Sequence, residues 1–212
     1  FFDNGIKTNF EVLLKNINTV GKNNPQYKDS PQSELMSAYV YNASLPLIKN
    51  TEKNRNTLEP KLSFRLSPHD MKNNSTQKRR MSIKNIYSAD RLGMGDSFES
   101  GESLTMGLNF KQERVKIKDE IKEISNFLDF KLATVLRFNE EKNIPINSTL
   151  NKKQSNLFGQ LKLRPNSHVS LNYDFSVTNN LDMIEYNSII ANFKYKKFNT
   201  SFNMLEEKGV IG

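Results

Sequence analysis

Residues Leu104–Lys111 read LTMGLNFK, and residues Val169–Val177 read VSLNYDFSV. Apolar and polar residues alternate in both stretches, so each is expected to form a β-strand with one apolar face and one polar face. Across the chain the polar face is rich in Lys, Arg, Asn and Asp, and the connections alternate between short and long. This combination is typical of an outer-membrane barrel, whose outside meets lipid and whose lumen holds water.

The same alternation recurs along the chain and predicts about nine strands. Their expected bounds are Ile6–Thr19, Leu35–Leu45, Leu58–Leu66, Leu104–Lys111, Leu128–Arg137, Leu157–Leu163, Val169–Val177, Met183–Lys196 and Phe198–Met204. We therefore expect an all-β fold, an antiparallel up-and-down transmembrane β-barrel segment that supplies about nine strands of a larger barrel. Residues 1–212 would be part of a single outer-membrane barrel domain. Because the chain starts without Met or a signal peptide and ends without a terminal aromatic residue, we expect an internal fragment.

Several connections are long, and the longest is residues 68–102, a length that is usually functional or disordered. Barrels place longer loops outside the cell and short turns in the periplasm, so connections one, three, five and seven should be extracellular. The seventh is short for that side. Residues 112–126 are open to two interpretations. Isoleucines at helical spacing favour an amphipathic helix, while strand extensions around a β-turn fit the pattern equally well.

Composition narrows the class of protein. Of the 212 residues, 36% are hydrophobic and none is Cys, so there is no thiolate metal site or disulfide framework. No stretch approaches the roughly 20 apolar residues that a membrane-spanning helix needs. The formal net charge of +8 suits an anionic partner, although a general bias of the source toward Lys and Asn would produce the same number.

No catalytic, cofactor-binding or metal-binding residue stands out. His69 and His168 each lie beside a proline-containing turn and lack partners at ligand spacing, so we interpret both as exposed turn residues. The run Lys78-Arg79-Arg80 could bind phosphate, but a loop run of charges is usually only solvated. We expect no enzyme, no cofactor and no nucleic-acid partner.

The alternation also assigns side chains to the two faces of the barrel wall. The apolar residues of the two quoted strands should face lipid: Leu104, Met106, Leu108, Phe110, Val169, Leu171, Tyr173 and Phe175. An unpaired charge facing hydrocarbon is costly, so basic residues of the strands should line the interior instead. These candidates for the lumen wall are Lys61, Arg65, Lys111, Lys131, Arg137 and Lys162.

One region carries a more specific signal. Residues Ile86–Asp96 read IYSADRLGMGD, and residues Glu102–Leu108 read ESLTMGL. Together they resemble the lipopolysaccharide-assembly outer-membrane protein family LptD, also called organic solvent tolerance protein. That family shows an apolar-aromatic pair, an Asn-Arg-Phe-type triplet, an Asp and then a strand that reads Leu-Thr-x-Gly-Leu. Arg91 and Asp96 fall on the family's Arg and Asp, whereas Asp90 replaces the usual Asn.

The resemblance implies an outer-membrane protein of a Gram-negative bacterium that transports lipopolysaccharide. The implied partners are lipopolysaccharide, outer-membrane lipid, an LptE-like plug lipoprotein in the lumen and a periplasmic LptA-like bridge that acts through an N-terminal domain outside this chain. Arg91 and Asp96 would hold the long loop together. The alternatives are another barrel, such as a TonB-dependent receptor or porin, and a soluble β-sandwich adhesin whose apolar residues are buried between two sheets.

Overall fold

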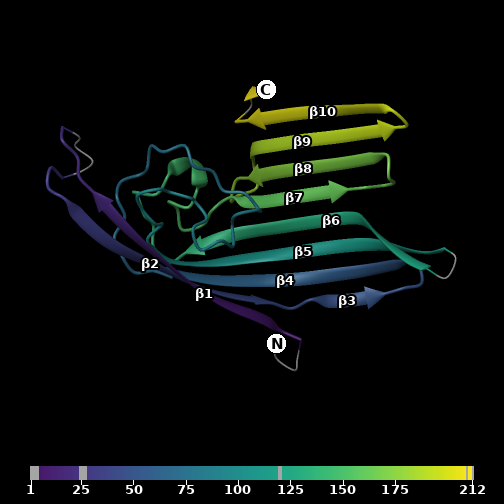
Figure 1. Cartoon of the computed structure of the whole chain (residues 1–212), viewed down its shortest axis with the longest axis horizontal. Helices are drawn as coiled ribbons and strands as arrows, with labels where there is room; N and C mark the ends of the chain where they lie inside the picture. Colours follow the sequence, from purple (N-terminus) through teal and green to yellow (C-terminus); the bar gives the residue numbers. More distant parts are fainter. Residues whose placement is uncertain (1–4, 24–27, 119–120, 209, 212) are drawn as a thin grey trace.

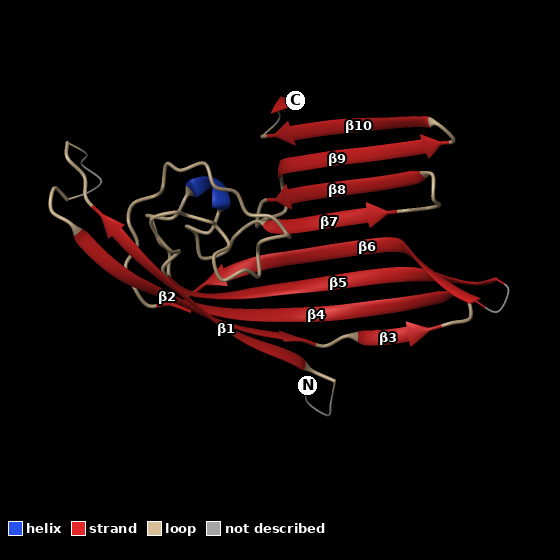
Figure 2. Ribbon diagram, viewed as in Figure 1, coloured by secondary structure: helices blue, strands red, loops and turns tan. Residues whose placement is uncertain are grey.

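The chain folds as one 11-stranded antiparallel sheet. The computed structural model describes every residue except 1–4, 24–27, 119–120, 209 and 212. The strands are β1 (Lys7–Thr19), β2 (Gln32–Ser44), β3 (Leu47–Asn50), β4 (Asn54–Ser67), β5 (Gly101–Lys118), β6 (Ile121–Arg137), β7 (Leu157–Leu163), β8 (Val169–Val177), β9 (Ile184–Tyr195), β10 (Phe198–Glu207) and β11 (Val210–Ile211). A 3-10 turn, η1 (Ile146–Ser148), lies in the loop after β6. Figure 2 shows how completely strands dominate.

Apart from β3, which pairs with β4 beside β2, each strand pairs with the next one along the chain, so the topology is up-and-down (Figure 1). Among the described residues no pairing joins β1 to β10 or β11, and the sheet is open at both edges. The prediction of an antiparallel, up-and-down barrel segment is therefore confirmed. The nine expected strands correspond to β1, β2 and β4–β10. The two short strands β3 and β11 were not expected.

β3 exists because the strand before it is interrupted at Pro46. β2 ends at Ser44, the chain passes Leu45 and Pro46, and β3 then continues along the same partner, β4. Opposite the interruption lies Pro60, in the middle of β4, whose carbonyl oxygen accepts a hydrogen bond from the Leu45 N–H at 3.1 Å. Proline has no N–H to donate to a ladder. The break therefore falls where the ladder already lacks a donor.

The sequence left residues 112–126 open between helix and strand. Residues 112–118 belong to β5 and residues 121–126 to β6, whereas residues 119–120 lie outside the described residues. β5 and β6 pair along their whole length, and the register shifts between Gln112 and Glu113, which marks a bulge. Beyond the bulge Val115 lies opposite Ile124. β-branched residues on paired strands favour the sheet over a helix that only charged i,i+4 pairs would support.

The connections fall at two ends of the sheet. Residues 20–31, 68–100, 138–156 and 178–183 connect strands at one end, and residues 51–53, 164–168 and 196–197 connect them at the other (Figure 1). Two of the first group, residues 68–100 and 138–156, fold back over one face of the sheet. We call this the inner face and the opposite one the outer face. The alternation of long and short connections that the sequence predicts thus reflects the two ends of the sheet.

The core lies between these two loops and the inner face. Its buried apolar residues are Met71, Met81, Ile83, Ile86, Leu92, Met94, Ala133, Val135, Ile144, Leu150 and Phe158. A smaller cluster joins Met36 and Ala38 of β2 to Phe98 of the first loop. Burying apolar side chains in this way stabilises a loop that would otherwise be free in solvent.

The outer face is apolar and uncovered. Phe10 is 63% exposed and Leu62 is 49% exposed, and register places the predicted lipid-facing residues of β5 and β8 on this side. The described residues contain no second sheet to cover this face, which argues against a two-sheet sandwich. β8 has 9 residues, and at about 3.3 Å per residue it is long enough to cross an apolar band of about 25 Å. In the described part of the chain, no helix has the length and apolar character to cross a membrane.

Candidate functional site

The inner face is held to the first loop by a carboxylate that three arginines surround. Glu99 is 2% exposed and accepts hydrogen bonds from Arg91 Nε at 2.6 Å and from Arg137 Nη1 at 2.5 Å. Arg91 Nη2 also donates to Glu99 Oε1. Arg65 Nη1 donates to the Glu99 carbonyl oxygen at 2.7 Å. We call these four residues the clamp, because it joins β4, β6 and two points of the loop.

Each arginine of the clamp uses its other N–H groups as well. Arg65 Nε donates to the carbonyl oxygen of Ala89 at 3.0 Å, and Arg137 Nη2 donates to that of Ser100 at 2.6 Å. Arg91 reaches back to β5, where its Nη2 lies 2.9 Å from Ser103 Oγ. A buried guanidinium is tolerated only when its donors are satisfied.

The charges of the clamp fix the protonation state of Glu99. Burial alone would raise the pKa of this carboxyl, but the positive charges of Arg91 and Arg65, the hydrogen bond from Arg91 and the charge of Arg137 outweigh burial and lower the pKa from 4.5 to about 2. The carboxylate is therefore ionised at neutral pH. Its charge compensates part of the buried positive charge of the arginines.

The two loops also hold each other. Asn74 N–H donates to the carbonyl oxygen of Asn143 at 2.9 Å, and Ile146 N–H donates to that of Ser75 at 3.2 Å. Together with the shared apolar core, these bonds make the two loops one packed body on the inner face.

Lys15 attaches the same body to β1. Its Nζ donates to Asp90 Oδ2 at 3.2 Å and to the carbonyl oxygens of Met94 at 2.6 Å and Ser97 at 3.3 Å. The same ammonium lies 4.3 Å from the centre of the Phe98 ring, within the range of a cation–π contact. The loop body thus spans the inner face from β1 to β6.

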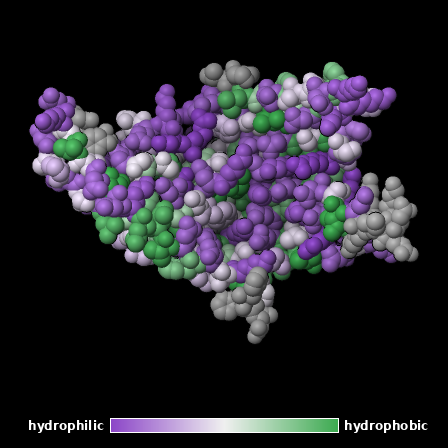
Figure 3. All heavy atoms as spheres, viewed as in Figure 1, coloured by the Kyte–Doolittle hydropathy of each residue, from purple (hydrophilic) through white to green (hydrophobic). Residues whose placement is uncertain are grey.

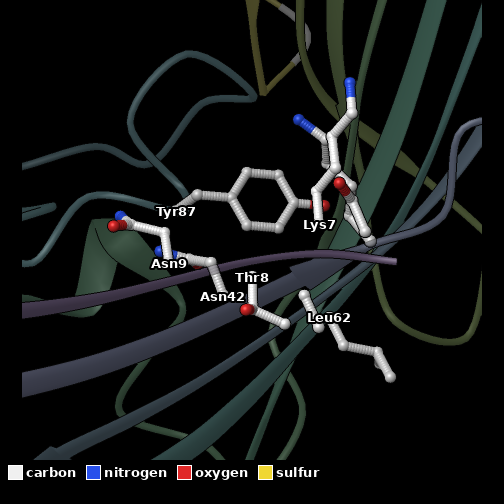
Figure 4. Close-up of a pocket in the computed structure, with 9 residues that line it drawn as sticks. Lys7, Thr8, Asn9, Asn42, Leu62 and Tyr87 are labelled. Carbon is white, nitrogen blue, oxygen red and sulfur yellow. The ribbon is translucent and has the colours of Figure 1, made fainter. Parts of the chain in front are cut away.

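The position of Tyr87 explains why β5, the strand that resembles the LptD pattern, carries a glycine at position 107. An ideal Cβ on Gly107 would lie 1.9 Å from the Tyr87 hydroxyl oxygen, so only a residue without a side chain lets the ring rest on β5. Burial first, and then the charge of Glu59, raise the pKa of Tyr87 to about 12. The ring borders a hollow of about 280 Å³ beside Lys7 and Asn42 (Figure 4).

The predicted basic residues all lie on the inner face, but they have different surroundings. Arg65 and Arg137 are buried in the clamp. Lys61 borders the first loop, with its ammonium 5.7 Å from the centre of the Tyr87 ring, whereas Lys111 and Lys131 lie beyond the loops. Each of the three is next to a carboxylate: Glu59 at 3.5 Å, Glu113 at 2.6 Å and Asp129 at 3.7 Å, respectively. Lys162 is paired across the strands with Asp129. This part of the wall is hydrophilic rather than purely basic, as the space-filling view shows over β6–β9 (Figure 3).

Sequence reasoning missed Glu99. It selected Arg91 and Asp96 from the resemblance. The structure pairs Arg91 with Glu99, and Asp96 is half-buried. The available signal was weak: a lone carboxylate next to Phe98 just before a strand, together with arginines at the loop ends of β4 and β6.

The interpretation of both histidines as exposed was right for His168 and wrong for His69. The long loop folds back over the sheet and covers His69, whose ring lies 5.9 Å from that of Phe98. Burial and the charge of Arg65 lower the pKa of His69. Within the described ranges, no three His, Asp or Glu side chains come together in a way that could hold a metal ion.

Comparison with known proteins assigns a family to the chain. The model of the family described as "LptD: LPS transport system D" matches residues 13–206, which is most of the chain and includes the whole clamp. No curated protein matches the chain. An all-β, up-and-down sheet with an uncovered apolar face agrees with this assignment. The chain therefore belongs to the LptD family, whose role is lipopolysaccharide transport.

Proposed function

We propose that this chain forms part of the wall of a barrel that inserts lipopolysaccharide into the outer leaflet of a Gram-negative outer membrane. Family membership supports the substrate. The uncovered apolar outer face supports contact with membrane lipid, because charged and polar groups are largely confined to the inner face. Residues 1–212 would belong to one barrel domain.

The clamp is the observation that carries this proposal. It fastens the loop body across the inner face at the end of the sheet where the long connections gather. If the loop body blocks the lumen at the end with the long connections, an amphipathic lipid cannot leave the barrel through that end. The lipid then leaves sideways into the membrane. In this proposal Arg91 and Asp96 both help to order the loop, with Arg91 acting through Glu99.

The part of the inner face that the loops leave uncovered would line the lumen. Lys111, Lys131 and Lys162 contribute to it, and Lys61 lies at its border beside Tyr87. The neighbouring carboxylates make this surface suitable for sugars and water as well as for phosphate. We propose that an LptE-like plug lipoprotein contacts this surface, and that an LptA-like bridge delivers lipopolysaccharide at the end where the short connections lie.

The test is to open the clamp in the protein as it occurs in the cell. Arg91→Ala should leave Glu99 with fewer donors and loosen the loop body, while Asp96→Ala tests the second residue separately. We expect less lipopolysaccharide at the cell surface and greater sensitivity to large antibiotics that an intact barrier excludes. A matched control is Arg55→Ala, since Arg55 is an arginine of β4 at the opposite end of the sheet with only a 3.9 Å ion pair to Glu113.

Two results would contradict the proposal. If Arg91→Ala leaves surface lipopolysaccharide and antibiotic exclusion unchanged while the protein reaches the membrane in normal amounts, the loop body has no part in transport. If Arg55→Ala has the same effect as Arg91→Ala, the defect comes from a general loss of stability rather than from the clamp.

A further inference from the structure

A basic hollow lies where the two loops meet the start of β9 and the end of β10. It consists of a space of about 270 Å³ and an adjoining one of about 80 Å³. Both spaces are lined by Arg80, Asn147 and Glu207. The first is also lined by Lys78 and Arg79 of the basic run that stood out in the sequence. Lys152 and Lys208 line the second. Three segments far apart in sequence therefore bring cations to one place.

Arg80 is held in position within this hollow. Its guanidinium forms an ion pair with Glu207 of β10 and lies 4.9 Å from the centre of the Tyr186 ring. A planar guanidinium fixed by a carboxylate and an aromatic ring loses little freedom when it binds an anion. Arg80 is therefore not merely a solvated loop charge, as a loop run of charges such as Lys78-Arg79-Arg80 usually is.

The charge balance in the hollow favours an anion. Lys78 and Arg79 are exposed, and neither forms an ion pair with any described residue. Of the two carboxylates, Glu207 is paired with Arg80, and Glu185 accepts a hydrogen bond from Asn156 Nδ2 at 2.7 Å. The cations that line the hollow are Lys78, Arg79, Arg80, Lys152 and Lys208. Positive charge therefore exceeds negative charge at this place.

We propose that the basic hollow binds the phosphate of a phosphorylated saccharide. Lysine and arginine provide the charge-assisted donors that phosphate oxygens accept. Asn147 and Thr149 offer polar groups for sugar hydroxyls, and Tyr186 offers an aromatic surface for a sugar ring. A space of about 270 Å³ is near the lower end of the range of about 300–1,000 Å³ for small-ligand sites, and more than a bare phosphate needs.

The proposed function suggests that the phosphorylated saccharide belongs to lipopolysaccharide. Only this choice of ligand rests on the proposed function. The hollow lies at the end of the sheet where the long connections gather, so a phosphorylated sugar of lipopolysaccharide would meet it on the way out of the lumen. Binding there would hold the saccharide next to the loop body while the lipid enters the membrane.

The test is a binding measurement on the whole protein purified in detergent. The probes are deacylated lipopolysaccharide oligosaccharide with its phosphates, the same oligosaccharide after dephosphorylation, and inorganic phosphate. The variant Lys78→Gln/Arg79→Gln removes two unpaired cations of the hollow. The control Lys49→Gln/Lys197→Gln removes the same charge from exposed positions at the opposite end.

We expect the phosphorylated probe to bind the unmodified protein and the control equally well, and to bind the hollow variant about 10-fold more weakly. Arg80→Lys keeps the charge but loses the planar fork, and should fall between them. The inference is overturned if the hollow variant binds as tightly as the control, or if the dephosphorylated oligosaccharide binds as well as the phosphorylated one. Equal binding of inorganic phosphate would overturn the saccharide part.

Failure of this inference can be told apart from failure of the proposed function. Loss of surface lipopolysaccharide in Arg91→Ala tests the clamp in cells and does not depend on the hollow. Unchanged binding in Lys78→Gln/Arg79→Gln together with a transport defect in Arg91→Ala would reject the hollow as a ligand site and leave the transport role in place.

Discussion

Replacing Glu99 by glutamine should release the loop body from the sheet. The change keeps the size of the side chain but removes the carboxylate that accepts hydrogen bonds from both Arg91 and Arg137. Removing one partner from a buried ion pair typically costs about 3–5 kcal/mol, because the remaining charge stays buried without compensation. An amide oxygen still accepts one hydrogen bond, so we expect the lower end, about 3 kcal/mol.

Hydrogen exchange of the backbone amides of residues 85–100 measures this loss directly. Every 1.4 kcal/mol is a factor of ten, so about 3 kcal/mol should reduce protection about 100-fold. Glu102→Gln is the matched control, since Glu102 is an exposed carboxylate three positions along the chain. Adding Arg137→Gln to Glu99→Gln should restore part of the protection by removing one uncompensated charge. If residues 85–100 are equally protected from hydrogen exchange in the unmodified protein and in both variants, the clamp does not hold the loop.

Three further outcomes follow from the same structure. Gly107→Ala should lower stability by about 1–3 kcal/mol, because the new methyl group would overlap the Tyr87 hydroxyl; a urea titration measures this, and Tyr87→Phe should recover part of the loss. Leu132→Arg, on the outer face, should cost about 2–4 kcal/mol in lipid vesicles, whereas Asn109→Arg on the inner face should cost much less; equal costs would reverse the face assignment. The depressed pKa of Glu99 means that its stabilising effect is complete above about pH 4.5 and is lost as pH falls toward 2. The difference in urea midpoint between the protein and Glu99→Gln should therefore shrink over that pH range, and a constant difference would contradict the assignment.

Local pattern was sufficient to predict the strands. The alternation in Leu104–Lys111 specifies which face each side chain takes, because a one-residue slip would turn the apolar set toward the polar side. β3 was missed because a break at Pro46 does not change the alternation on either side of it. Residues 112–126 could not be assigned because a short amphipathic stretch fits two periods, and only pairing with a partner strand decides between them.

The clamp was harder to predict from the sequence than the strands were, for a physical reason. Glu99 is separated from Arg137 by 38 positions and from Arg65 by 34. Nothing in the local sequence around a single carboxylate indicates which distant cations will surround it. The resemblance drew attention to Arg91 in the loop, but the pairing of Arg91 with Glu99 depends on the folded-back path of the chain. The path itself depends on apolar loop residues such as Ile86 and Leu92, which have no periodic signal of their own.

The clamp also has a consequence for the order of assembly. Arg65 lies on β4, Glu99 in the next connection and Arg137 on β6, so the clamp is complete only when both strands are in the sheet. Until β6 is in place, the Glu99 carboxylate lacks one of the donors that compensate its burial. The loop body therefore cannot reach its final packing during early pairing. The loop body would then pack onto the inner face only after β4 and β6 have both joined the sheet, and a half-assembled wall would leave that face uncovered.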